Sequence, residues 1–166
     1  MTAFSPAGSW RTAKDYEAVS KPFRIIYFLL PLLMVLVWLF LRIAAVRRFL
    51  NKQAMEYGDR VPHADVYASM RSMRKTHILP GLLTSMGVIG AIKPWRVESN
   101  IPVLIAWCEQ DKVIPFETYG TAMLEAIDGA ETVIVKGVGH VPMYDDPAQV
   151  AALILQTAGK AEAQAA

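Results

Sequence analysis

The sequence contains a single cysteine among its 166 residues, Cys108, and this scarcity limits the chemistry open to it. One cysteine excludes an intrachain disulfide and any metal site built from several cysteines. It is compatible with a reducing cytoplasm, where we expect the protein to lie, with membrane association as an open possibility. No cleavage-like stretch of small residues precedes the first strongly apolar run near Phe23, so we expect no signal peptide.

Acidic residues are scarce in the first part of the chain, and basic residues are scarce in the second. Residues 1–97 contain 14 lysines and arginines against 5 aspartates and glutamates (net +9), whereas residues 98–166 contain 3 against 10 (net −7). A basic segment raises the question of an anionic partner. Neither a recognition motif nor a basic stripe with interleaved aromatic residues occurs, so we expect no nucleic acid partner.

Charged residues are absent from the seventeen residues 25–41, which read IIYFLLPLLMVLVWLFL. As one helix they would span about 25 Å at roughly 1.5 Å per residue, short of the roughly 30 Å hydrocarbon core of a bilayer. Basic residues flank both ends, so the charge bias that orients a spanning helix is weak. Pro31 predicts two shorter helices instead of one. A membrane span, an interfacial element and buried helices of a soluble or oligomeric protein all remain open, and the sequence favours buried helices.

Two amphipathic patterns follow this run. Apolar residues recur at helical spacing over residues 43–50, and a second helix is predicted from about residue 65 to residue 75, after Pro62. His63 and His77 stand in charged surroundings without metal-ligand partners at fixed spacing, so we assign them surface or capping roles. We expect no bound metal and no cofactor.

From residue 101 the pattern changes to that of a parallel sheet. PVLIAW (102–107) and TVIVKG (132–137) are short apolar runs typical of strands buried on both faces, and a helix is predicted between them over residues 116–127. This order predicts a crossover unit with parallel strands. A closing helix is predicted over residues 147–157, with Asp145 and Asp146 as its N-terminal cap, followed by a disordered tail at 159–166.

The loops that leave these two strands contain Asp111 and His140. Because parallel strands end at the same edge of a sheet, the loops are expected to be neighbours. A carboxylate bonded to one ring nitrogen of a histidine fixes its tautomer and stabilises the protonated ring. The alternative is that Asp111 caps the following helix while His140 fills a turn. The pairing of both residues on adjacent loops favours the acid–base interpretation.

IPVLIAWCEQDKVIPF (101–116) and GVGHVPMYDDPAQVAALIL (137–155) together resemble the last third of an α/β-hydrolase. The acid loop of that family reads W-G-E-x-D-x-x-x-P, and here it runs from Trp107 to Pro115 with Cys108 in place of the glycine. The histidine loop is similar to G-x-G-H-x-P with a downstream D-x-P. TAFSPAGSW (2–10) resembles the strand before the family's helical cap.

The resemblance implies an α/β class and a partial α/β-hydrolase fold, with about three parallel strands at the C-terminal end of the sheet. Residues 1–10 would form a strand and the entry to the cap, residues 11–96 the cap, with apolar helices at 23–50, and residues 97–158 the C-terminal part of the core. Asp111 and His140 would be the catalytic acid and base for hydrolysis of an ester or related bond in a small hydrophobic substrate. The bond itself stays open among ester, lactone, epoxide, haloalkane and carbon–carbon bonds.

The nucleophile of that family, carried by G-x-S-x-G, is absent from the sequence. Cys108 is a poor substitute because acidic neighbours raise the pKa of a thiol. We therefore expect the chain alone to be inactive. The strand at 2–5 would have an unpaired edge, which predicts self-association or pairing with another chain that could supply the nucleophile. The alternative is a non-catalytic membrane-associated or scaffold protein that uses residues 25–41 as an anchor.

Overall fold

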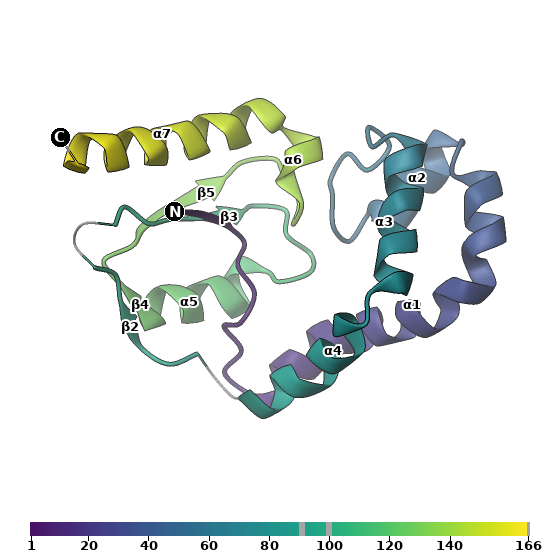
Figure 1. Cartoon of the computed structure of the whole chain (residues 1–166), viewed down its shortest axis with the longest axis horizontal. Helices are drawn as coiled ribbons and strands as arrows, with labels where there is room; N and C mark the ends of the chain where they lie inside the picture. The colour runs from purple at the N-terminus through teal and green to yellow at the C-terminus, as the bar shows by residue number, and fades with distance from the viewer. Residues whose placement is uncertain (90–91, 99–100, 166) are drawn as a thin grey trace.

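The computed structural model describes residues 1–89, 92–98 and 101–165 of the chain. Its elements follow in the order β1 (Thr2–Phe4), α1 (Ala13–Phe40), α2 (Ala44–Asn51), α3 (His63–Lys75), α4 (Ile78–Ile89), β2 (Trp95–Arg96), β3 (Leu104–Cys108), a π-helical turn η1 (Phe116–Gly120), α5 (Thr121–Ala126), β4 (Ile127–Asp128), β5 (Glu131–Val135), α6 (Pro142–Asp145) and α7 (Pro147–Ala165) (Figure 1).

The main sheet has three parallel strands in the order β1-β3-β5. β3 lies in the centre, with Ala3 of β1 opposite Ile105 and Val133 of β5 opposite Ala106. Among the described strands, β1 pairs with β3 alone, so its other edge carries no strand. The predicted α/β class and the three parallel strands are confirmed. A short parallel pair of β2 and β4 was not predicted.

Helices cover both faces of this sheet, and the side chains of β3 alternate between them. Ile105 and Trp107 pack with Met123 of α5 and with Trp10 and Tyr16, which lie near the start of α1. Ala106 and Cys108 face the other way, where they pack with Val135 of the neighbouring strand β5 and with Leu153 of α7. The central strand is therefore buried on both sides, which explains its uninterrupted apolar sequence.

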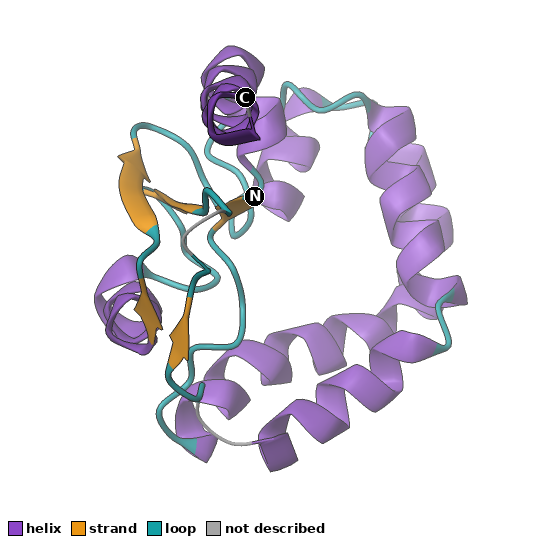
Figure 2. Cartoon of the chain, turned by 60° about the vertical axis from the view of Figure 1, so that its left-hand side comes forward, coloured by secondary structure: helices purple, strands orange, loops and turns teal. Residues whose placement is uncertain are grey.

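Helices α1 to α4 form an insertion between β1 and the rest of the sheet, and we refer to residues 13–89 as the helical insertion (Figure 2). α1 packs against both α3 and α4. At one end the insertion has its own small core of Leu41, Val61 and Val66. At the other end the Tyr16 hydroxyl donates to the carbonyl of Leu83, which fastens α1 to α4.

α1 is one continuous helix, so the prediction that Pro31 would divide it in two was wrong. Its start is defined by a capping box, in which Thr12 and Asp15 accept from each other's backbone N–H groups at 3.2 and 2.9 Å. Pro22 and Pro31 both lie at exposed positions within it. A proline there removes one backbone bond and bends the helix, and Figure 1 shows α1 changing direction along its length.

The apolar run of α1 is largely exposed within the chain, so it does not form the buried helices expected of a single soluble chain, whereas its burial in an oligomer stays a prediction. Only 11% of its most apolar window of eighteen residues is buried within the chain. One stripe, including Leu30 and Met34, packs inward, whereas Phe28, Leu32 and Val35 are 76%, 78% and 74% exposed. By length and composition α1 could also cross a membrane.

The C-terminal helix is longer than predicted. α7 starts at Pro147, as expected, but it continues to Ala165 where a disordered tail was predicted from residue 159. Alanines are frequent in this tail, and alanine has the highest helix propensity. The last residue of the predicted tail, Ala166, lies outside the described residues.

Candidate active site

Asp111 and His140 come together at the edge of the sheet where β3 and β5 end. The register places Cys108, the last residue of β3, opposite Val135, the last residue of β5. Asp111 follows three residues after the first of these and His140 five residues after the second. Both loops therefore leave the same edge side by side, as parallel neighbours must.

The two side chains are joined by a hydrogen bond of 2.8 Å between Nδ1 of His140 and Oδ2 of Asp111. The Asp111 side chain is fully buried, whereas 26% of the His140 side chain is exposed. With an ionised aspartate, Nδ1 carries the proton and donates it to the carboxylate, which leaves Nε2 free to accept one. The pair thus has a buried orienting acid and an accessible base.

The other oxygen of Asp111 is used by its own loop. Oδ1 accepts the backbone N–H groups of Val113 and Ile114 at 2.9 and 2.8 Å. Asp111 therefore both shapes its own loop and bonds to the imidazole, but it does not cap the following helical turn, whose N-cap residue is Pro115, so that alternative was wrong. All of these bonds favour the carboxylate orientation that faces His140.

The acid and histidine loops are also fastened to each other. The backbone N–H of Gln110 donates to the carbonyl of Val138 at 2.9 Å. The carboxylate of Glu109 binds Nζ of Lys136 at 2.7 Å and the backbone N–H of Gly137 at 3.0 Å. The ammonium group of Lys136 and this N–H hold the pKa of Glu109 below its usual range.

Asp145 links the histidine turn to the helical insertion, and its predicted role as a cap of the closing helix was wrong. Its buried carboxylate accepts three backbone N–H groups, from Gly139 at 2.8 Å, Glu56 at 2.9 Å and Tyr57 at 2.8 Å. Asp146 alone caps α7, accepting the N–H of Gln149 at 2.9 Å. The sequence offered no signal for the bonds of Asp145, because their partners lie up to 89 residues away.

The segment 54–57 of the insertion lies directly against the histidine turn. The N–H of Val141 donates to the carbonyl of Ala54 at 2.8 Å. A Cβ atom on Gly139 would lie 2.8 Å from the Cα of Met55, so only glycine fits there. On the acid loop, Lys112 forms an ion pair with Glu56 at 2.9 Å. One short segment therefore contacts both loops of the Asp111–His140 pair.

Cys108 is unsuited to act as a nucleophile. Its side chain is fully buried at the end of β3, and burial raises the pKa of the thiol to about 11, with Asp111 and Asp145 adding smaller contributions in the same direction. The sequence anticipated the direction from the acidic neighbours but not that burial is the main cause. At neutral pH the thiolate, which is the reactive form, is scarce.

Ser5, at the end of β1, has a left-handed backbone with φ of 38°. Such strain often marks functional positions. However, Ser5 is buried, and its Oγ accepts the N–H of Cys108 at 3.0 Å, so it secures β1 to β3. His63 and His77 are both exposed, in keeping with the surface roles assigned to them. Within the described part of the chain, no three His, Cys, Asp or Glu side chains are grouped to hold a metal ion.

Comparison with known proteins agrees with this architecture. A sequence model of the "Alpha/beta hydrolase family" matches residues 3–153, which include both loops and the helical insertion. The chain is 39% identical over 99 residues to "Epoxide hydrolase EphH" of Mycobacterium tuberculosis, an alignment that covers 58% of this chain. It covers 39% of the mycobacterial protein, so the chain spans about two fifths of its length. Since the family model matches most of the chain, the protein belongs to the α/β-hydrolase family.

Proposed function

We propose that this chain supplies the acid and base of a hydrolase active site, with His140 as the general base and Asp111 as the acid that orients it. The 2.8 Å bond between Nδ1 and Oδ2 is the observation that carries the proposal. It leaves Nε2 of the partly exposed imidazole as the proton acceptor. A histidine held in this way can take a proton from a serine hydroxyl or from a water molecule.

The nucleophile comes, in this proposal, from residues that the sequence does not contain. It lacks G-x-S-x-G, the thiol of Cys108 is buried and protonated, and Ser5 is buried and bonded to β3. The free edge of β1 is the place where a further strand would join the sheet, either from a second copy or from another polypeptide. Without a nucleophile and oxyanion donors, the acid–base pair gives little turnover. Loss of one oxyanion donor alone raises the activation free energy by about 3 kcal/mol.

The helical insertion acts as the cap of this site. Its segment 54–57 contacts the histidine turn through Val141 and Asp145 and the acid loop through Lys112. We propose a small hydrophobic substrate with an ester or related bond. An epoxide is a specific candidate, because the mycobacterial relative is named an epoxide hydrolase. Epoxide opening usually requires an aspartate nucleophile, and the same histidine would then activate water.

The experiment compares the chain alone with the chain co-expressed with a hydrolase segment that carries a nucleophile turn, using a nitrophenyl ester and an epoxide as substrates. The chain alone is expected to hydrolyse neither above the rate of its His140→Ala variant. In the complemented enzyme, Asp111→Asn is expected to lower kcat roughly 10⁴-fold, because the wrong ring nitrogen then carries the proton.

His77→Ala is the matched control, since His77 is an exposed histidine of the insertion, and it should leave the complemented activity unchanged. Strong ester hydrolysis by the chain alone that is lost in His140→Ala would overturn the assignment of the nucleophile to other residues. Complemented activity that survives His140→Ala would overturn the role of the histidine. A complex that forms but never turns over would favour the alternative of a non-catalytic scaffold.

A further inference from the structure

The outer face of α1 is an apolar surface that nothing in the described chain covers. Three residues one turn apart, Phe28, Leu32 and Val35, are each about three-quarters exposed, at 76%, 78% and 74%. Trp38 extends the same helix and is 54% exposed, with the guanidinium of Arg42 at 5.8 Å from its ring. An apolar surface of this length on a folded protein marks an interaction site.

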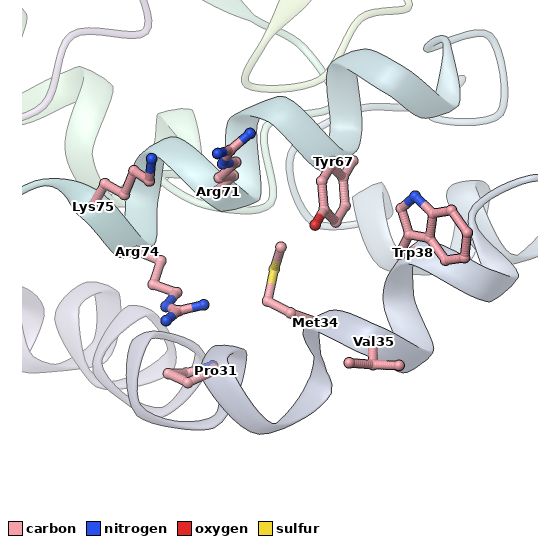
Figure 3. A pocket seen from close by; sticks show the side chains of 8 residues that line it. All are labelled: Pro31, Met34, Val35, Trp38, Tyr67, Arg71, Arg74 and Lys75. Atoms are coloured by element: carbon pink, nitrogen blue, oxygen red, sulfur yellow. The ribbon is translucent and has the colours of Figure 1, made fainter.

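Cations lie beside this apolar surface. A groove of about 640 Å³ between α1 and α3 is lined by Pro31, Val35 and Trp38 on one side and by Arg71, Arg74 and Lys75 on the other (Figure 3). Arg74 extends from α3 towards Pro31 in Figure 3. All three cations are exposed, and none of them makes an ion pair with any side chain that the structure describes.

The charge of the whole insertion has the same sign. Residues 13–89 contain 11 lysines and arginines against 5 aspartates and glutamates, a net charge of +6. An apolar helix face bordered by cations and an interfacial tryptophan is the pattern of a helix that lies in the surface of an anionic membrane. The positive charge of the insertion would repel a basic protein surface, such as a second copy of this insertion.

The position of the three cations favours a surface orientation of α1 over a spanning one. They stand next to the middle of the apolar run, so a membrane-crossing α1 would carry two arginines and a lysine into the hydrocarbon core. When α1 lies parallel to the surface, the same cations reach the level of the lipid phosphates while Phe28 and Leu32 enter the acyl region.

We propose that the helical insertion docks onto an anionic lipid bilayer through the outer face of α1, with Arg71, Arg74 and Lys75 binding lipid phosphates. This docking does not depend on the role of His140. It would bring the site to the place where apolar substrates accumulate.

The test is flotation of the purified full chain with phosphatidylcholine vesicles, with and without phosphatidylglycerol. The wild-type chain should float with the anionic vesicles. The triple variant Phe28→Gln, Leu32→Gln, Val35→Gln should lose at least about 100-fold in affinity, because it removes the apolar contact. The triple variant Arg71→Gln, Arg74→Gln, Lys75→Gln should lose roughly 100-fold on anionic vesicles only. Ile154→Gln with Leu155→Gln, on exposed α7, should bind like the wild type.

Depth is measured separately, through fluorescence quenching by brominated lipids, which needs no destabilising variant. Quenching should disappear in Trp38→Phe and persist in Trp95→Phe, because both tryptophans are about half exposed but Trp95 lies on β2. Failure of the wild-type chain to bind anionic vesicles would overturn the proposal. So would resistance to alkaline carbonate extraction, which indicates a span, or an oligomer that ignores vesicles and becomes monomeric in the apolar variant, which indicates a second copy.

Discussion

Replacing Asp145 is expected to detach the helical insertion from the histidine turn. Its carboxylate accepts three backbone N–H groups, two of them on Oδ2, from Gly139 and Glu56, and one on Oδ1, from Tyr57. Gly139 belongs to the buried turn that precedes His140, whereas Glu56 and Tyr57 belong to the insertion. One side chain therefore joins two segments that are distant in the sequence.

The size of the effect follows from these bonds. Asp145→Ala leaves one buried and two half-buried N–H groups without an acceptor, at about 2 kcal/mol for Gly139 and about 1 kcal/mol for each of the others, or about 4 kcal/mol together. Asp145→Asn can keep its oxygen in the place of Oδ2 and retain two bonds. Its amide group then faces the N–H of Tyr57, and we expect a loss of about 2 kcal/mol.

Urea unfolding measures the free energy, and amide hydrogen exchange locates the change. In Asp145→Asn the amide of Tyr57 should exchange faster, while those of Gly139, Glu56 and β3 should change only as far as global stability does. Asp128→Asn is the control, because Asp128 is an exposed carboxylate whose ion pair with Arg96 lies on the surface. If Asp145→Asn is no more destabilising than Asp128→Asn, the three bonds do not hold the insertion and the reasoning fails.

Three further predictions concern the loops of the site. In nitrogen NMR spectra His140 should carry its proton on Nδ1, and Asp111→Asn should move it to Nε2; an unchanged tautomer would mean that the 2.8 Å bond does not orient the ring. Cys108, with its pKa near 11 against an ordinary 9.0, should hold about 100-fold less thiolate and react with iodoacetamide only slowly until the chain is unfolded, and rapid alkylation of the native chain would contradict its burial. Lys136 lowers the pKa of Glu109 in the folded state, so the ionised Glu109 stabilises the protein above its unfolded-state pKa, and this stabilisation is lost as the pH falls through the folded-state pKa. Glu109→Gln should therefore be less stable than wild type at neutral pH and equal to it in acid. Urea unfolding across pH measures the difference.

The sheet and the acid–histidine pair could be predicted because their physical causes are local in the sequence. A central parallel strand is buried on both faces, so β3 reads as an unbroken apolar run. β5 was also predicted to be buried on both faces, but it lies at the edge of the described sheet and Val135 is its one buried residue. Once these two strands are neighbours, their outgoing loops must meet at one edge. The positions of Asp111 and His140 then follow from topology without knowledge of any long-range contact.

The course and exposure of α1 could not be predicted in the same way. Proline inside a helix usually ends it, but here Pro22 and Pro31 lie at exposed positions of α1, and the helix bends and continues. An apolar run on a helix also usually predicts a buried helix. The run contains no charged residues to distinguish its inner stripe, which includes Leu30 and Met34, from its outer face, so the sequence carried little information about which side would be covered.

The contact between segment 54–57 of the insertion and the site depends mostly on backbone atoms of that segment, and this has a consequence for how the two parts can vary. Asp145 accepts N–H groups of Glu56 and Tyr57, and Val141 donates to the carbonyl of Ala54. Of the contacts described between this segment and the two loops, the ion pair of Lys112 with Glu56 is the one that uses a side chain of the insertion. Outside this segment, Arg60 donates to the carbonyl of Asp145 at 3.0 Å and Asp65 accepts from the Tyr144 hydroxyl at 3.3 Å. A sequence that keeps the turn and these two side chains can therefore keep the contact, while the helices on either side remain free to present a different outer surface. The apolar outer face of α1 and the neighbouring cations of α3 are for this reason properties of the insertion that can be changed without disturbing the geometry of Asp111 and His140.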